Sequence, residues 1–111
     1  MEELSSGQVV LATFPFSNLE SSKVRPYLLL GIAEFEDVVL CQITSRRYRS
    51  KSAISLTNDD FSSGSIIVSS FIRPNKLATL NKSKVRRVLG IVSDSKMSEV
   101  KLNLKNFLDI S

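Results

Sequence analysis

The chain has 111 residues, 42% of them hydrophobic, and a formal net charge of +4. This length supports one hydrophobic core, so we expect a single domain over residues 1–111, and the apolar content excludes a disordered tail. The apolar runs are far shorter than the ~20 residues of a membrane span, and the N-terminal residues MEELSSG lack the features of a secretory signal, so we expect a cytoplasmic protein without a membrane partner.

The first half of the chain predicts three strands. Apolar and β-branched runs place them at Gln8–Phe16, Tyr27–Ala33 and Val38–Ile43, the last uncharged and expected to be buried on both faces. Ser17–Lys23 is a longer polar connection than a tight hairpin needs, and it is either an ordinary surface loop or a lid. Glu34–Asp37 reads as a short acidic turn.

The second half predicts shorter elements. Three further strands are expected at Ala53–Leu56, Ile66–Ser70 and Lys76–Leu80, with a bend at Arg73-Pro74-Asn75. The spacing of Val85, Val88 and Leu89 predicts a short helical turn that ends near Gly90.

A final helix is expected after a cap at Asp94 or Ser95. Its apolar residues form one stripe, with three lysines outside it; the stripe is Met97, Val100, Leu104, Phe107 and Leu108, and the lysines are Lys96, Lys101 and Lys105. Short strands followed by a closing helix predict an α+β fold, a small and strongly curved antiparallel β-barrel with short helices and a C-terminal helix.

Residue types exclude several kinds of site. The chain has no histidine and one cysteine, Cys41, so it holds no Ser-His-Asp triad, no His-ligated metal, no Cys-based zinc site and no internal disulfide. Its glycines are scattered, and its carboxylates cluster on turns. We therefore expect neither a cofactor nor a catalytic metal.

Basic residues are unevenly distributed. No Asp or Glu occurs from Val38 to Asn58 or from Phe61 to Ser93. These two stretches hold ten of the fifteen basic residues: Arg46, Arg47, Arg49, Lys51, Arg73, Lys76, Lys82, Lys84, Arg86 and Arg87. The asymmetry favours a polyanionic partner, although a solvated basic face would give the same pattern.

Cations and hydroxyls remain as candidates for chemistry. Arg25 precedes Pro26 at a strand start, Thr44 and Ser45 end an apolar strand, and Arg73 precedes Pro74. Such a set suits a phosphodiester, and it needs no enzyme nucleophile if the ribose 2′-OH of RNA attacks the neighbouring phosphate. Taken singly, Arg25 reads equally as the partner of a strand-end carboxylate, Thr44 as an ordinary strand residue and Arg73 as a turn residue.

Four segments in order resemble the MazF/PemK family of toxins of bacterial toxin–antitoxin pairs. They are GQVVLATFPFS, KVRPYLLL, VVLCQITS and SSFIRPNKLATL, followed by Leu89-Gly90, and the resemblance covers Gly7–Phe107. It implies an SH3-like barrel, usually a homodimer, and a sequence-selective endoribonuclease that leaves 2′,3′-cyclic phosphate and 5′-OH ends. It also implies a cognate antitoxin.

The resemblance assigns roles to individual residues. Arg25 matches the family arginine that serves in proton transfer and phosphate stabilisation, Thr44 matches the strand-end threonine that holds the phosphate, and Arg73 matches an active-site arginine of some members. Asn75 stands where some relatives have Asp, which implies weaker activity if that Asp matters. Because arginine is a poor base, we expect a slow nuclease.

The segment RRYRSK, Arg46–Lys51, follows Thr44 and Ser45 directly. We predict that its arginines and Tyr48 bind RNA and that Tyr48 does so by stacking on a base. The full set of predicted RNA-binding residues is Ser45, Arg46, Arg47, Tyr48, Arg49, Arg73 and Lys76. The same segment could instead be contacted by an acidic, disordered part of the antitoxin. Two other functions stay open: a non-catalytic SH3-like module that binds nucleic acid or protein, and a gyrase-inhibiting toxin of the same fold.

Overall fold

The computed structural model describes residues 3–14, 23–46 and 52–109. Seven strands form one antiparallel sheet in the order β4-β6-β3-β2-β1-β7-β5. Their bounds are β1 Gln8–Phe14, β2 Lys23–Ile32, β3 Asp37–Thr44, β4 Ile54–Leu56, β5 Phe61–Gly64, β6 Ser70–Asn81 and β7 Val85–Val92, with single 3-10 turns η1 Glu34–Glu36, η2 Asn58–Asp60 and η3 Lys82–Lys84 and one helix, α1 Asp94–Leu108.

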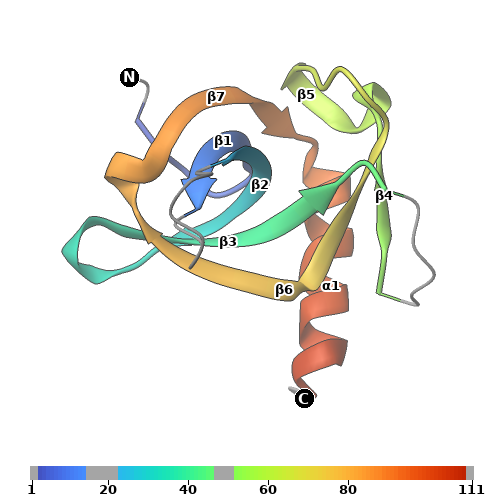
Figure 1. The fold of residues 1–111 in the computed structure, drawn as a ribbon. Coiled ribbons are helices and arrows are strands. Elements are labelled where there is room, and N and C mark those ends of the chain that lie inside the picture. Colours follow the sequence, from blue (N-terminus) through green and yellow to red (C-terminus); the bar gives the residue numbers. More distant parts are fainter. Residues whose placement is uncertain (1–2, 15–22, 47–51, 110–111) are drawn as a thin grey trace.

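The sheet curls on itself, and α1 packs at one side of it (Figure 1). Strands β4 and β5 are the two ends of the sheet, yet they follow one another in the chain through η2. This short connection ties the open edges together. The expected curved antiparallel fold with a C-terminal helix is confirmed.

Alternating residues of the strands feed two apolar clusters. Leu28 and Cys41 belong to a cluster with Val100 of α1, whereas Tyr27 and Leu40 belong to a second cluster on the other face of the sheet. This is the two-residue period of a strand that is covered on both sides. No residue of β3 is exposed, which agrees with the burial expected for its uncharged part, Val38–Ile43.

Strand β2 begins earlier than predicted. It starts at Lys23, so Arg25 and Pro26 lie inside the strand and pair with Ala12 and Leu11 of β1. Pairing between β2 and β3 begins only at Tyr27, so the missing amide hydrogen of Pro26 interrupts no bond to β3. Of the predicted loop over residues 17–23, only Lys23 falls among the described residues.

The sequence prediction was wrong for the segment from Ile66 to Asn75. Residues 66–69 connect two strands, β5 lies earlier at Phe61–Gly64, and β6 begins at Ser70. The predicted bend at Arg73-Pro74-Asn75 is a bulge inside β6, because Cys41 pairs with Leu77 but Gln42 pairs with Arg73. The chain therefore keeps pairing with β3 on both sides of the proline.

The helical turn predicted from Val85, Val88 and Leu89 is strand β7. Two bulges in β7 explain the error. Consecutive residues of β1 pair with Gly90 and Val88, which skips Leu89, and then with Arg87 and Val85, which skips Arg86. Each skipped residue breaks the two-residue alternation, so the apolar spacing imitates a helical period.

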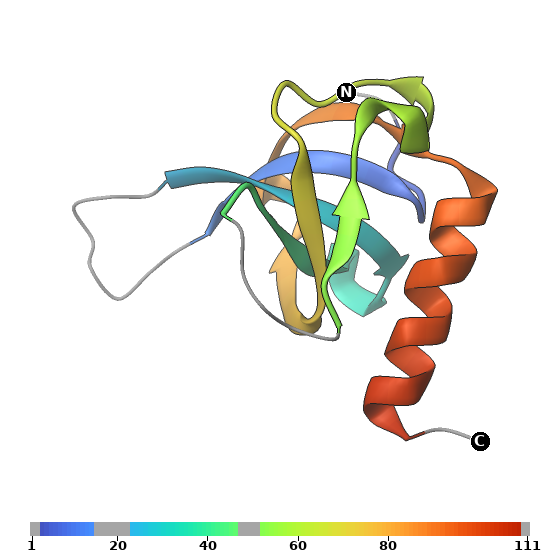
Figure 2. The same cartoon turned by 90° about the vertical axis from the view of Figure 1, so that its right-hand side faces the viewer.

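The cap of helix α1 is Ser93, one residue before Asp94 and two before Ser95, the predicted caps, and the Ser93 Oγ accepts a hydrogen bond from the Lys96 amide at 3.1 Å. Met97 and Leu104 pack against the core around Val100, as predicted. Phe107 and Leu108 do not: both are about half exposed, where the helix extends past the strands (Figure 2).

Lys96, predicted to lie outside the apolar stripe, is only 8% exposed. Its Nζ donates to the carbonyl of Ser55 and to the Glu99 carboxylate, each at 2.9 Å, and lies 3.6 Å from Asp60. The ammonium thus joins the helix to β4 and η2, which offsets the cost of burying its charge. Within the described ranges, no helix is both long and apolar enough to cross a membrane.

Candidate functional site

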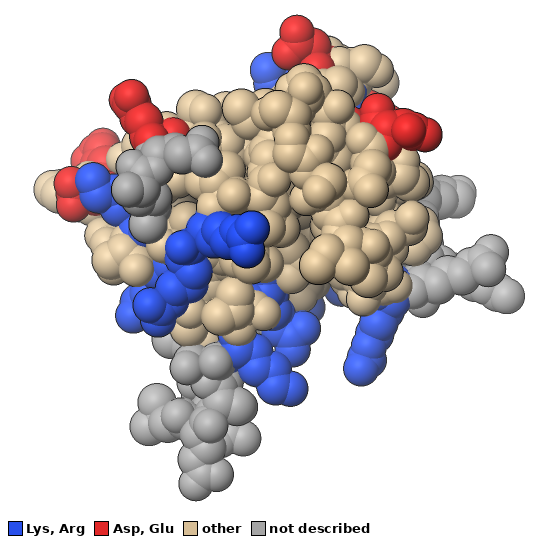
Figure 3. All heavy atoms as spheres, turned by 90° about the horizontal axis from the view of Figure 1, so that it is seen from above, with Lys and Arg blue, Asp and Glu red and all other residues tan. Residues whose placement is uncertain are grey.

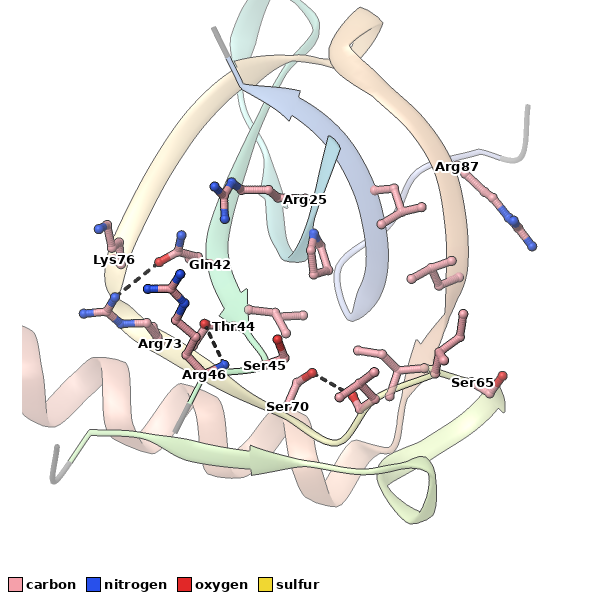
Figure 4. Close-up of a pocket in the computed structure, with 17 residues that line it drawn as sticks. Arg25, Gln42, Thr44, Ser45, Arg46, Ser65, Ser70, Arg73, Lys76 and Arg87 are labelled. Atoms are coloured by element: carbon pink, nitrogen blue, oxygen red, sulfur yellow. Dashed lines mark hydrogen bonds between the residues drawn. The ribbon is translucent and has the colours of Figure 1, made fainter. Parts of the chain in front are cut away.

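An open hollow of about 710 Å³ lies beside the start of β2 and the end of β3 (Figure 4). Strand β6 and the residues that precede it, 65–68, also border it. Every predicted site residue in the described part of the chain lines it: Arg25, Thr44, Ser45, Arg46, Arg73 and Lys76. The fold therefore gathers residues from three strands that are distant in the sequence. Arg47, Tyr48 and Arg49 lie outside the described residues.

The end of β3 supplies the hydroxyl groups. Gln42 and Thr44, two positions apart, lie on the same face of the strand, and both line the hollow. The Thr44 Oγ1 accepts a hydrogen bond from the Arg46 amide at 3.1 Å, which fixes the turn that leaves the strand. Since this oxygen acts as an acceptor, the hydroxyl proton of Thr44 can be donated to a bound oxyanion.

Arg25 lies inside β2 rather than on a loop, paired with Ala12. It is half-buried, and its guanidinium points across the hollow toward β3 and β6 (Figure 4). Its charge is also felt two residues along the strand: burial raises the pKa of Tyr27, and the positive charge of Arg25 partly offsets this rise. A strand gives Arg25 a more rigid support than the predicted loop end.

Strand β6 supplies two more cations. Arg73 is half-buried, and its Nη1 donates to the Gln42 Oε1 at 3.4 Å, while Lys76 is exposed on the same rim. Asn75 is exposed and is not among the residues that line the hollow. Its side chain is therefore not positioned in this conformation to replace a catalytic Asp.

The charge of the hollow is positive. Five cationic residues and no carboxylate border it among the described residues: Arg25, Arg46, Arg73, Lys76 and Arg87. The Arg87 side chain points away from the hollow, unlike that of Arg25 (Figure 4). On one face of the molecule, Lys and Arg side chains gather while Asp and Glu side chains lie at the margins (Figure 3). Such a site attracts and orients anions.

An apolar rim borders the hollow opposite these cations. Ile67 is fully exposed and Val68 is 54% exposed, although the segment is well anchored: the Ile66 amide donates to Asn58 at 2.8 Å, and the Ser70 hydroxyl donates to the Val68 carbonyl at 2.8 Å. A fixed segment that exposes two β-branched side chains is typical of an interaction surface.

Sequence reasoning missed Gln42 and the apolar rim. Gln42 sits in a strand that reads as core, and the signal was its polarity two positions before Thr44. No three His, Cys, Asp or Glu side chains come together as a metal site in the parts of the chain that the structure describes. The thiol of Cys41 is buried, and burial raises its pKa to about 12, so it supplies no thiolate.

Comparison with known proteins gives one family. The model of PemK-like, MazF-like toxins of type II toxin–antitoxin systems matches residues 5–108. No curated protein matches the sequence significantly.

Solved structures share the fold at low sequence identity. A mycobacterial endoribonuclease in complex with its cognate antitoxin is 18% identical, with a TM-score of 0.78 over 98% of each chain. A MazE–MazF structure from Deinococcus radiodurans is 20% identical, with a TM-score of 0.78 over 97% of this chain and 98% of that one. The Mycobacterium tuberculosis toxin MazF-mt6 is 16% identical, with a TM-score of 0.74 over 94% and 98%.

Proposed function

The chain belongs to the PemK-like, MazF-like toxins of type II toxin–antitoxin systems, and from this premise we propose that it is a metal-independent endoribonuclease that cleaves single-stranded RNA. The observation that carries the proposal is the hollow, which Arg25, Arg73 and Thr44 line without a carboxylate among the described lining residues. This donor set suits a phosphodiester, and the described lining residues include no carboxylate, the side chain that most often binds a divalent cation. Similar solved structures of mycobacterial endoribonucleases support the proposal.

In the proposed reaction the substrate supplies its own nucleophile. The ribose 2′-oxygen bonds to the adjacent phosphorus as the bond from phosphorus to the 5′-oxygen breaks, which leaves a 2′,3′-cyclic phosphate and a 5′-OH. The 2′-OH loses a proton, and the leaving 5′-oxygen gains one. Holding the attacking and leaving groups in line supplies much of the rate enhancement, since the reaction is intramolecular.

The side chains stabilise the charge that builds up on the phosphorane. Arg25 and Arg73 present guanidinium donors to its equatorial oxygens, and Thr44 donates its hydroxyl proton. Guanidinium is a poor base, so Arg25 contributes charge more than proton abstraction. Rates are then those of a slow nuclease, because general acid–base help is typically worth about 10²- to 10⁴-fold.

Ser45, Arg46 and Lys76, which line the hollow, bind the flanking nucleotides, and so do Arg47, Tyr48 and Arg49, which follow Arg46 in the sequence. The positive hollow also suits an acidic, disordered segment of a cognate antitoxin, which would fold as it binds and exclude RNA. Structures of relatives with a cognate antitoxin support this partner. A homodimer fits the exposed Ile67 and Val68, which a second copy would cover.

The test is incubation of long single-stranded RNA with the antitoxin-free protein in EDTA. Wild type should give discrete fragments, whereas Arg25→Ala and Thr44→Val should lose most activity, because each removes a donor to the phosphate. Arg87→Ala is the matched control, since it removes a charge beside the hollow that points away from it, and it should retain activity. Circular dichroism verifies that each variant is folded.

Equal cleavage by wild type and Arg25→Ala would remove Arg25 from the site. Intact RNA with the folded wild type, together with binding that weakens in salt, would instead identify a non-catalytic binding module.

A further inference from the structure

The bulge in β6 decides which residue faces Gln42. Cys41 pairs with Leu77, so an unbroken register would place Lys76 opposite Gln42. The bulge over Pro74–Lys76 places Arg73 there instead, and the side chain of Pro74 is fully buried. A rigid, buried proline holds the bulge in place. The local fold is thus arranged around the Gln42–Arg73 pair.

The contact between these side chains is a single hydrogen bond. The Arg73 Nη1 donates to the Gln42 Oε1 at 3.4 Å, and both residues are half-buried at the wall of the hollow (Figure 4). The acceptor is a neutral amide. A carboxylate in its place would pair with the guanidinium in a fork geometry and cancel most of its charge. An amide orients the guanidinium without adding a negative charge beside it.

We propose that Gln42 is a positioning residue for Arg73: it fixes the guanidinium at the wall of the hollow and adds no charge of its own. The inference rests on the proposed nuclease function and names a residue that this function had not used. Gln42 lies on β3, two positions from Thr44, and so it ties the β6 cation to the strand that carries the hydroxyl donor. Because the Arg73 side chain is already oriented before a phosphate binds, it loses less conformational entropy on binding.

A double-mutant cycle tests this role. We would measure kcat and KM on an RNA oligonucleotide for wild type, Gln42→Met, Arg73→Ala and the double variant. Gln42→Met keeps the volume but removes the acceptor, and it should lower kcat/KM about 3- to 10-fold, since the hydrogen bond is long. The same change should have no further effect when Arg73 is absent. Gln8→Met, a buried glutamine outside the hollow, controls for loss of stability alone.

A second variant separates orientation from charge. Gln42→Glu keeps an acceptor but adds a negative charge, so binding of an uncleavable 2′-deoxy analogue should weaken. The dependence of its affinity on salt should fall by about one phosphate contact. Gln42→Met should leave that salt dependence close to the wild-type value, because Arg73 keeps its charge.

Three outcomes would overturn the proposal: a Gln42→Met enzyme as active as wild type, an equal loss in the presence and absence of Arg73, or wild-type salt dependence in Gln42→Glu. If wild type does not cleave RNA at all, the nuclease proposal fails. The double-mutant cycle is then measured as affinities for the 2′-deoxy analogue, and these values test the role of Gln42 independently of cleavage.

Discussion

Two glycines allow β5 to lie against β7, and replacing one of them should detach this edge of the sheet. Gly64 pairs with Gly90, and a Cβ on Gly90 would lie 2.4 Å from the Ser63 carbonyl oxygen and 2.9 Å from the Gly64 Cα. Real side chains never approach backbone this closely. Gly90→Ala therefore forces β5 away from β7, because no flexible side chain can move aside.

The cost follows from what β5 holds in place. Its displacement exposes the side chain of Ile66, which is buried at the start of the apolar rim and is worth about 1.5–3 kcal/mol. Each lost backbone hydrogen bond adds about 1 kcal/mol. We expect the free energy of unfolding of Gly90→Ala to fall by about 2–4 kcal/mol, the range found when well-packed sites are overfilled.

Gly31→Ala is the matched control in the same sheet. A Cβ on Gly31 meets no atom within 4 Å, so this change should be neutral or stabilising by up to about 1 kcal/mol. Both values are measured by urea unfolding followed by circular dichroism, with the slope m compared between variants. A Gly90→Ala protein as stable as Gly31→Ala would show that β5 does not depend on this close approach.

Three further predictions concern the helix, the buried thiol and the apolar rim. Lys96→Met should lower the free energy of unfolding by about 1.5–3 kcal/mol, because it leaves the hydrogen-bond partners of a buried ammonium without their donor. Lys101→Met, on the exposed side of the helix, should change it by less than about 0.5 kcal/mol. Equal effects of the two substitutions would contradict this prediction. Burial raises the pKa of Cys41 from 9.0 to about 12, so the thiol loses its proton at lower pH in the unfolded state than in the folded state. The free energy of unfolding should therefore fall between these pH values, and it should fall less steeply in Cys41→Ala. The same dependence on pH in both proteins, measured by urea unfolding, would refute this prediction. If the apolar rim forms the proposed homodimer interface, Ile67→Asp should give a monomer in size exclusion with light scattering. Ile32 is also exposed, but Ile32→Asp should leave the dimer intact. A dimeric Ile67→Asp protein would place the interface elsewhere.

The sequence predicted the elements whose periodicity is unbroken. Apolar runs located the start of β1 and both ends of β3 to within one residue, and the spacing of Met97, Val100 and Leu104 located α1. The predicted end of the first strand, at residues 15 and 16, lies outside the described residues. It failed where bulges interrupt the alternation: Arg86 and Leu89 are skipped in the pairing of β7 with β1, so a strand resembled a helical turn. Bulges are set by the partner strand, which no local pattern records.

The site was predictable in part for the same reason. Arg25, Thr44 and Arg73 stand out because charge or hydroxyl follows or precedes an apolar run, and the curl of the sheet brings them to one hollow. The polarity of Gln42 two positions before Thr44 could have pointed to the hollow, but its pairing with Arg73 could not be predicted, since that depends on the β6 register opposite it. Lys96 was misplaced because a helical stripe does not show which neighbouring carbonyl and carboxylates will reach a lysine.

The chemistry is tested most directly with one substituted oligonucleotide. After the cleaved position is mapped, RNA and the same RNA carrying a single 2′-deoxy nucleotide at that position are incubated with the protein in EDTA, and the ends of the products are analysed. We predict that the RNA is cut to 2′,3′-cyclic phosphate and 5′-OH ends and that the substituted strand stays intact at that position. Cleavage of both strands, or a requirement for added metal, would contradict an attack by the substrate's own 2′-hydroxyl in a metal-independent site.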